Sequence, residues 1–291
     1  MRLFAFKLND QSPRLGAELP GTDRLIDLHA ANPALPSNLL SFVRGGERCL
    51  VRARKLLKNP LVANSTYALT AVRLLAPIPR PGKILCSGVN YRSHHEENPE
   101  AKLPDEPFFF AKMPSTVIGP GDPIHYPKRT NQLDYEIEFA VVIGRRMSAT
   151  PENEVRSCIF GYTILHDVSA RDVQFHGNQI TLGKNFDSFC PIGPCVVTSD
   201  ELPNPENVRL RTYLNGKIMQ NGSTAEWVFS LPRLLSFLSE TMTLEPGDIV
   251  STGTPAGVGV FRRPPIFLRP GDLVRLEIEG IGVLENPVIA G

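Results

Sequence analysis

Apolar and polar residues alternate with a period of two through much of the chain after residue 80, and this period predicts β-strands. Two stretches there have helical spacing instead: residues 151–159, which place Pro151 at a first helical position, and residues 230–242, with leucines on one face. The strand-like segments are KILCSGV, VVIG, FGYTILHD, PCVVT, VRLRTYLNG, DIVSTG, LVRLEIEG and a short NPVI.

The first 75 residues have a different pattern. MRLFAFKL alternates as a strand, and Leu39 to Leu57 have helical spacing with many basic residues. A proline-rich connector, LAPIPRPG, follows at residues 75–82. We therefore expect a small α+β N-terminal domain over residues 1–75 and a mostly-β domain with α+β elements over residues 76–291.

Three acidic residues alternate with apolar ones in LDYEIEFAVVIG. On a strand, Asp134, Glu136 and Glu138 share one face, and that face continues as the apolar Ala140 and Val142. Two neighbouring carboxylates that resist burial alone can converge on one cation. The alternative is an edge strand whose acidic face is solvated.

A third carboxylate follows another strand-like run, GYTILHD, in which Asp167 stands at the strand end. Three carboxylates without His or Cys form an oxygen-only ligand set, which suits Mg²⁺ or Mn²⁺ and argues against structural zinc. The alternative for Asp167 is a cap on the following turn.

Cationic and amide side chains follow in the chain. Lys184 lies among apolar and glycine residues in TLGKNFDSF and is either a cation near a developing negative charge or a surface lysine. Arg171 and Gln174 would share one side of a helical turn with Asp167. Arg171 is then a candidate for two-pronged binding of a substrate carboxylate, or else pairs with Asp172 or another acid.

His94 and Glu97 are three residues apart, so on a helical turn the carboxylate can orient the imidazole as a base. The acidic, proline-containing stretch through Pro107 is a candidate lid. Thr252 or Thr254, in the glycine-rich STGTPAGVG, is a candidate donor to a substrate carboxylate, although such a loop is also typical of a turn or bulge.

Composition narrows the classes of partner. A net charge of +1 over 291 residues predicts no nucleic-acid binding, and no apolar run is long enough to predict a membrane span. The five cysteines form no CxxC pair or metal-binding spacing, and the N-terminus lacks a signal-peptide pattern. We therefore expect a cytoplasmic protein that acts on a small molecule.

Seven motifs resemble those of the fumarylacetoacetate hydrolase superfamily and occur in the same order. The resemblance is in particular to the branch of proteins that contain a fumarylacetoacetate hydrolase domain and are similar to 2-hydroxyhepta-2,4-diene-1,7-dioate isomerase. The resemblance covers about residues 80–291. The motifs are GVNYRSHHEE, PFFFAKMPSTVIGPGDPI, LDYEIEFAVVIG, GYTILHDVSARDVQ, TLGKNFDSF, LNGKIMQ and LEPGDIVSTGTPAGVG.

The resemblance implies a mixed β-sandwich roll, assembled as a homodimer. It implies Mg²⁺ or Mn²⁺ as the cofactor, with Ca²⁺ as an inactive substitute. By motif position it implies metal ligands at Glu136, Glu138 and Asp167, catalytic roles for His94, Glu97 and Lys184, and substrate contacts at Arg171, Gln174 and Thr254.

The main functional expectation is hydrolysis of a carbon–carbon bond in a β-diketo acid, such as an acylpyruvate, fumarylpyruvate or a diketo-deoxy sugar acid. His94 and Glu97 would activate water, and the reaction would pass through a metal-bound enolate. Oxaloacetate decarboxylation, tautomerisation, and isomerisation or hydration of a 2-oxo-alkenoate are alternatives on the same site. The alternative from another functional class is a binding protein that is stabilised by a metal and has no catalytic activity.

Overall fold

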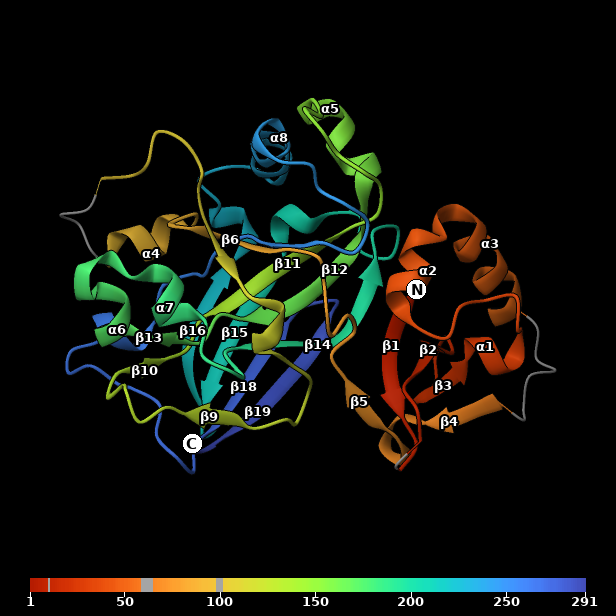
Figure 1. Cartoon of the computed structure of the whole chain (residues 1–291), viewed down its shortest axis with the longest axis horizontal. Coiled ribbons are helices and arrows are strands. Elements are labelled where there is room, and N and C mark those ends of the chain that lie inside the picture. Colours follow the sequence, from red (N-terminus) through yellow and green to blue (C-terminus); the bar gives the residue numbers. More distant parts are fainter. Residues whose placement is uncertain (10, 59–64, 98–101) are drawn as a thin grey trace.

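The computed structural model describes residues 1–9, 11–58, 65–97 and 102–291. Its largest feature is a mixed sheet with the strand order β4-β3-β2-β1-β14-β12-β11-β17-β6-β7 (Figure 1). Two further strands join this sheet: β5 pairs with β1, and β8 pairs with β14. The bounds of these strands are β1 (Arg2–Lys7), β2 (Arg14–Glu18), β3 (Arg24–Asp27), β4 (Thr66–Ala68), β5 (Arg73–Leu75), β6 (Ile84–Gly88), β7 (Phe108–Lys112), β8 (Val117–Ile118), β11 (Ile137–Ile143), β12 (Ile159–His166), β14 (Cys190–Thr198) and β17 (Ile249–Ser251).

A second, five-stranded sheet packs on this one and completes a β-sandwich. Its order is β16-β15-β18-β19-β9, and β15, β18 and β19 lie against β11, β12 and β14 of the large sheet. The expected mostly-β fold with a mixed sandwich is confirmed. The strands are β9 (Ile124–Tyr126), β15 (Arg209–Leu214), β16 (Lys217–Ser223), β18 (Leu273–Ile278) and β19 (Gly282–Ala290).

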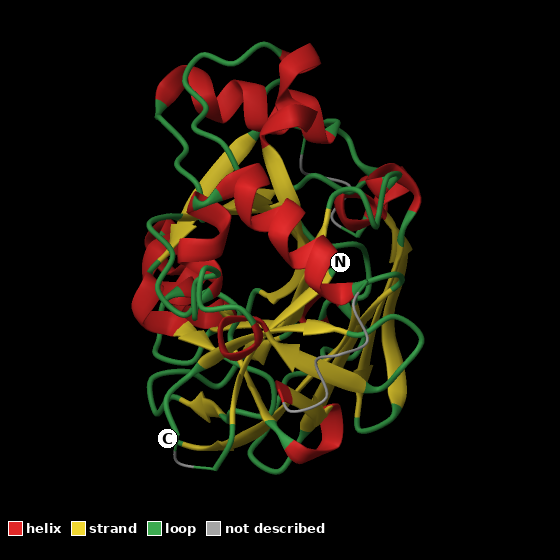
Figure 2. Ribbon diagram, turned by 90° about the vertical axis from the view of Figure 1, so that its right-hand side faces the viewer, coloured by secondary structure: helices red, strands yellow, loops and turns green. Residues whose placement is uncertain are grey.

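The helices lie around the sheets (Figure 2). They are α1 (Leu28–Ala31), α2 (Leu39–Arg44), α3 (Gly46–Leu57), α4 (Arg92–Glu96), α5 (Glu152–Val155), α6 (Arg171–Phe175), α7 (Ile180–Lys184) and α8 (Leu231–Thr241). In the described part of the chain, none of them combines the length and the apolar composition needed to cross a membrane.

Helix boundaries differ from the sequence prediction where the backbone turns. The stretch predicted as helical over residues 39–57 is two helices, because Gly46 has a left-handed φ of 55° that breaks the helix. The segment predicted at 151–159 is the short α5 followed by a 3₁₀ turn, and Pro151 caps α5 instead of beginning it. Helix α8 forms as predicted, with Ser230 as its cap.

The acidic segment is not one continuous strand. Leu133–Asp134 form β10, which pairs with β13 (Ser169–Ala170), whereas β11 pairs with β12 and β17 inside the large sheet. The chain therefore changes sheets between the two strands, at Tyr135 and Glu136. Because β11 has a neighbour on both sides, the alternative of a solvated edge strand is wrong.

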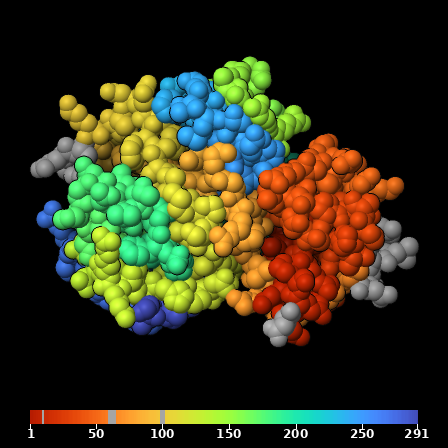
Figure 3. Space-filling view, in the orientation of Figure 1, coloured from red at the N-terminus to blue at the C-terminus, as the bar shows by residue number. Residues whose placement is uncertain are grey.

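The N-terminal segment continues the large sheet, because β1 pairs with β14. Its residues form a lobe against one end of the molecule (Figure 3). Phe42 of α2 packs edge-on against Phe160 of β12, with ring centroids 6.2 Å apart, within a core shared by the two segments. The domain boundary after residue 75 stays a prediction.

This shared core predicts that Phe42→Ala destabilises the whole chain. The variant should lose about 3–5 kcal/mol in the free energy of unfolding, since it leaves a cavity against Phe160. Val51→Ala is the matched control, because Val51 lies in the same segment but is 54% exposed, and it should cost well under about 1 kcal/mol. Denaturant titration followed by fluorescence measures both, and equal losses would contradict the prediction.

Candidate active site

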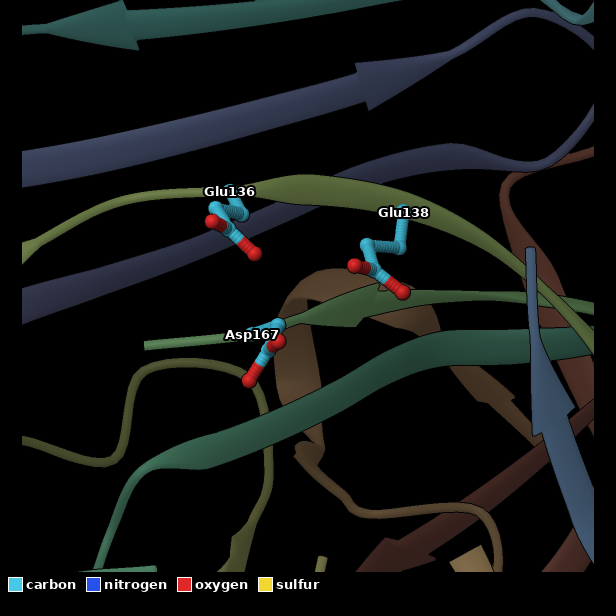
Figure 4. Close-up of side chains that lie close together, drawn as sticks. All are labelled: Glu136, Glu138 and Asp167. Atoms are coloured by element: carbon cyan, nitrogen blue, oxygen red, sulfur yellow. The ribbon is translucent and has the colours of Figure 1, made fainter. Parts of the chain in front are cut away.

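The three predicted carboxylates converge at one end of the β11–β12 pair. Ile137 of β11 pairs with His166 of β12, so Glu136 and Glu138 flank the position that Asp167 enters from the end of β12. One oxygen of each carboxylate lies within 4.8 Å of the others, and all three side chains are buried. Figure 4 shows the three side chains lying close together.

Buried cations hold two of these carboxylates. Lys184 Nζ donates to Glu136 Oε2 at 2.8 Å and to Asp167 Oδ2 at 2.6 Å. Arg171 Nη2 donates to Glu136 Oε1 at 2.6 Å, and Lys112 Nζ donates to Asp167 Oδ1 at 2.6 Å. Lys184 is therefore not a surface lysine, and Asp167 is not a turn cap.

Lys112 is the cation that sequence reasoning missed. It ends β7, is 1% exposed, and also donates to the backbone oxygen of Lys184 at 2.6 Å. The signal available in the sequence was a lysine that ends the apolar run FFFAK, because a lysine carried into a core needs a charged partner.

Glu138 is the member of the triad without a cationic partner among the described residues. It accepts a hydrogen bond from the hydroxyl of Ser251. Burial, followed by the negative charges of Asp167 and Glu136, raises the pKa of Glu138 well above its usual value. Burial also acts to raise the pKa of Glu136, but Arg171 and Lys184 outweigh it and hold that pKa below its ordinary value.

This donor set fits a divalent cation. The three carboxylates supply only oxygen ligands, as Mg²⁺ and Mn²⁺ prefer. A bound cation would also compensate the unpaired negative charge at Glu138, whose burial is otherwise unfavourable.

The predicted dyad forms at the end of α4. His94 Nδ1 is 2.7 Å from Glu97 Oε2, and Glu97 Oε1 accepts from the backbone N–H of Gly257 at 2.8 Å. Because the carboxylate occupies Nδ1, Nε2 is the ring nitrogen left for proton exchange. Of the candidate lid that continues to Pro107, residues 98–101 lie outside the described residues.

Arg171 does not pair with Asp172, which instead accepts from Thr130 and the backbone of Asn131. Its Nε donates to Asp134 Oδ2 at 2.8 Å and its Nη1 to Gln174 Oε1 at 3.1 Å. Its role as a substrate contact stays a prediction.

Two carboxylates of the triad (Glu136 and Glu138), His94 of the dyad, Lys184 and the substrate-contact candidates line one cavity of about 250 Å³. Its wall combines charged and polar side chains with apolar ones, among them four phenylalanines. The cavity is lined by Ser87, Gly88, Val89, His94, Phe108, Phe110, Glu136, Glu138, Arg171, Gln174, Phe175, Ile180, Lys184, Thr254 and Phe261.

Two relatives match nearly the whole chain. An oxaloacetate tautomerase from Xenopus laevis is 43% identical over 99% of this chain and 90% of its own length. The oxaloacetate tautomerase YisK from Bacillus subtilis is 40% identical over 91% of this chain and 93% of its own length.

The expectation of a cytoplasmic protein is wrong on this comparison, because the Xenopus laevis relative is named mitochondrial, as is a human one that is 40% identical. The expectation rested on unpaired cysteines, and free thiols indicate reducing conditions without identifying the compartment.

Solved structures share the fold over the full chain. A fumarylacetoacetate hydrolase from Exiguobacterium antarcticum superposes with a TM-score of 0.85 at 38% identity, with all of both chains covered. A maleylpyruvate hydrolase from Sphingobium sp. SYK-6, solved with manganese(II) and pyruvate, superposes with a TM-score of 0.81 at 30% identity over the same full coverage. Residues 83–289 match the C-terminal family of fumarylacetoacetate hydrolase, and with the relatives above this shows that the chain belongs to the fumarylacetoacetate hydrolase family.

Proposed function

We propose that this enzyme interconverts the enol and keto forms of oxaloacetate or a closely similar 2-oxo dicarboxylate. The observation that carries the proposal is the joint position, on one cavity, of a buried lysine, two carboxylates of the triad and an oriented imidazole. The names of the Xenopus laevis and Bacillus subtilis relatives support this reaction over the hydrolysis expected first. Their catalytic activity also argues against a non-catalytic binding protein.

Mg²⁺ or Mn²⁺ is the proposed cofactor, held by Glu136, Glu138 and Asp167. When bound, such an ion would act as a Lewis acid that favours the ionised, enolate form of the substrate oxygen at C2. The manganese(II) in the Sphingobium structure supports this choice of ion. The homodimer implied by the family resemblance stays a prediction.

Lys184 is suited to stabilise the negative charge of an enolate. Burial acts to lower its pKa, but Asp167 and Glu136 outweigh burial and raise the pKa above its usual value. The ammonium therefore stays charged at neutral pH and acts by electrostatics, not as a base.

His94 is the proposed group that moves the proton. In the enol-to-keto direction, C3 takes a proton from Nε2, and the C2 hydroxyl gives its proton to solvent as the C2 carbonyl forms. Solvent then returns a proton to Nε2. Glu97 holds Nδ1 and keeps the ring oriented, and Gly257 holds Glu97 in turn.

His94→Ala should therefore lower kcat for tautomerisation of oxaloacetate by about 10²–10⁴-fold, the usual contribution of a positioned acid or base. The decay of enol absorbance in the presence of Mn²⁺ measures it. His125→Ala is the control, since His125 is exposed on β9 and absent from the cavity lining. A His94→Ala variant as active as the control would refute the assignment.

Hydrolysis of an acylpyruvate is the second candidate, and the His94–Glu97 pair is the observation that favours it, since such a pair can also activate water. The maleylpyruvate hydrolase among the structural neighbours shows this chemistry in a similar fold. Release of pyruvate from acylpyruvates at a higher kcat/KM than oxaloacetate tautomerisation would favour hydrolysis over our proposal.

The metal proposal predicts that Glu138→Gln removes the rise in melting temperature that Mn²⁺ gives the wild-type protein, because one of three ligands is lost. Without metal, the variant should melt no lower than the wild type, since a neutral amide avoids the burial and like-charge repulsion that raise the pKa of Glu138. Glu240→Gln, at an exposed acid of α8, is the control and should respond to Mn²⁺ as the wild type does. An unchanged Mn²⁺ response in Glu138→Gln would contradict the ligand assignment.

A further inference from the structure

Gln220 of β16 is a buried amide that joins the two sheets behind the cavity. It is 1% exposed. Its Oε1 accepts from the backbone N–H of Ile137 at 3.1 Å and from the hydroxyl of Thr212 at 2.9 Å. Its Nε2 donates to Thr254 Oγ1 and to the backbone oxygen of Pro255, each at 2.8 Å. Every polar position of the amide is therefore occupied.

The orientation of this amide is fixed by its two backbone partners. The N–H of Ile137 can only donate, so the atom that faces it is the oxygen. The carbonyl of Pro255 can only accept, so the atom that faces it is the nitrogen. Exchanging the two atoms would leave both backbone groups facing atoms of the wrong kind in a buried site.

This orientation decides what Thr254 can do. A hydroxyl that accepts from Nε2 keeps its own proton free, and no acceptor for that proton occurs in the described part of the chain. Thr254 lines the cavity and is 3% exposed. Its hydroxyl is therefore set as a donor, and an anionic oxygen in the cavity is the partner that suits it.

The loop that carries Thr254 is docked closely on β16. Gly257 has a φ of 108°, and a Cβ there would lie 2.2 Å from the backbone oxygen of Met219. At Gly222 of β16, a Cβ would lie 2.4 Å from Cβ of Pro255. These glycines let the backbones approach closely enough for Gln220 to reach the loop, and they limit movement of Thr254.

We propose that Gln220 is a positioning residue that fixes the Thr254 hydroxyl as a hydrogen-bond donor to a carboxylate oxygen of the bound 2-oxo acid. The inference rests on the proposed function for the class of substrate. It assigns to Gln220 a part in substrate affinity, although Gln220 does not line the cavity.

A purely structural role for Gln220 would have a different signature. Through the N–H of Ile137, the amide also supports the backbone between Glu136 and Glu138. If that support were its whole contribution, removing the amide would weaken Mn²⁺ binding and lower kcat, and the effect would not depend on Thr254.

The test is a double-mutant cycle on the full chain with Gln220→Met and Thr254→Val. The readouts are the dissociation constant of pyruvate measured by calorimetry with saturating Mn²⁺, the KM and kcat for oxaloacetate, and the affinity for Mn²⁺. Thr212→Val is the matched control, since it removes the other side-chain partner of Gln220 and leaves Thr254 untouched.

Each single variant should raise the pyruvate dissociation constant and KM about tenfold, the loss expected for one hydrogen bond to a charged group, with little change in kcat. The double variant should be no weaker than Thr254→Val alone. Thr212→Val should melt lower but bind pyruvate as the wild type does. Additive losses in the double variant, or a fall in Mn²⁺ affinity that accounts for the loss, would overturn the inference.

Gln220→Glu serves if Gln220→Met does not fold. The glutamate side chain is nearly isosteric with glutamine. Even when it is neutral, its carboxyl group has a single proton, which cannot be donated to both the Thr254 hydroxyl and the Pro255 carbonyl. The variant should therefore weaken pyruvate binding only when the Thr254 hydroxyl is present. Wild-type protein that binds pyruvate without tautomerising oxaloacetate would refute the proposed function, and the binding constants would still decide the role of Gln220.

Discussion

The structure depends on a buried cluster of opposite charges at the carboxylate triad. Asp134, Glu136, Glu138 and Asp167 face three cations, Lys112, Arg171 and Lys184, and all seven side chains are nearly inaccessible to solvent. Burying charges is unfavourable unless each is paired in good geometry, and removal of one partner from such a cluster typically costs about 3–5 kcal/mol. Loss of any one of these partners would therefore destabilise the packing of the segments that supply them.

Glu138 is the carboxylate of this cluster that has no cationic partner in the described part of the chain, and its negative form is therefore disfavoured. This imbalance makes the site receptive to a divalent ion, because an added positive charge relieves the cost of burying the carboxylate. The cations around Glu136 and Asp167 limit mutual repulsion before an ion arrives. Lys184 then has a second use, since an ammonium that holds two carboxylates also faces a cavity in which an enolate would develop negative charge.

The glycine-rich loop after β17 links the parts of the site that lie on different elements. Gly257 fixes Glu97 of the dyad through its backbone N–H, and its missing Cβ allows close contact with β16. The same contact brings Thr254 to Gln220, which in turn holds the backbone of β11 between two carboxylates. The residues proposed for proton exchange, substrate binding and cation binding are thus connected through one tightly packed loop.

The sequence by itself determined the elements and the chemical type of the site. Period-two alternation marked the strands. Asn-Gly is a residue pair typical of a tight hairpin turn, and Asn215 and Gly216 join β15 to β16 with φ of 51° and 80°. Carboxylates at alternate positions, with Asp167 at a strand end, indicated an oxygen-only cation site. Those signals are local and need no knowledge of distant contacts.

Tertiary structure decided which of the open alternatives held. Alternation cannot tell an interior strand from an edge, and the pairing of β11 with both β12 and β17 settled that point. The distant partners of Lys112, Arg171 and Gln220 lie 34 to 83 residues away in sequence, in positions set only by the tertiary fold; these partners are Asp167, Asp134, Glu136, Ile137 and Thr254. The sequence shows which side chains carry a charge or an amide, but the tertiary structure determines which group each of them pairs with.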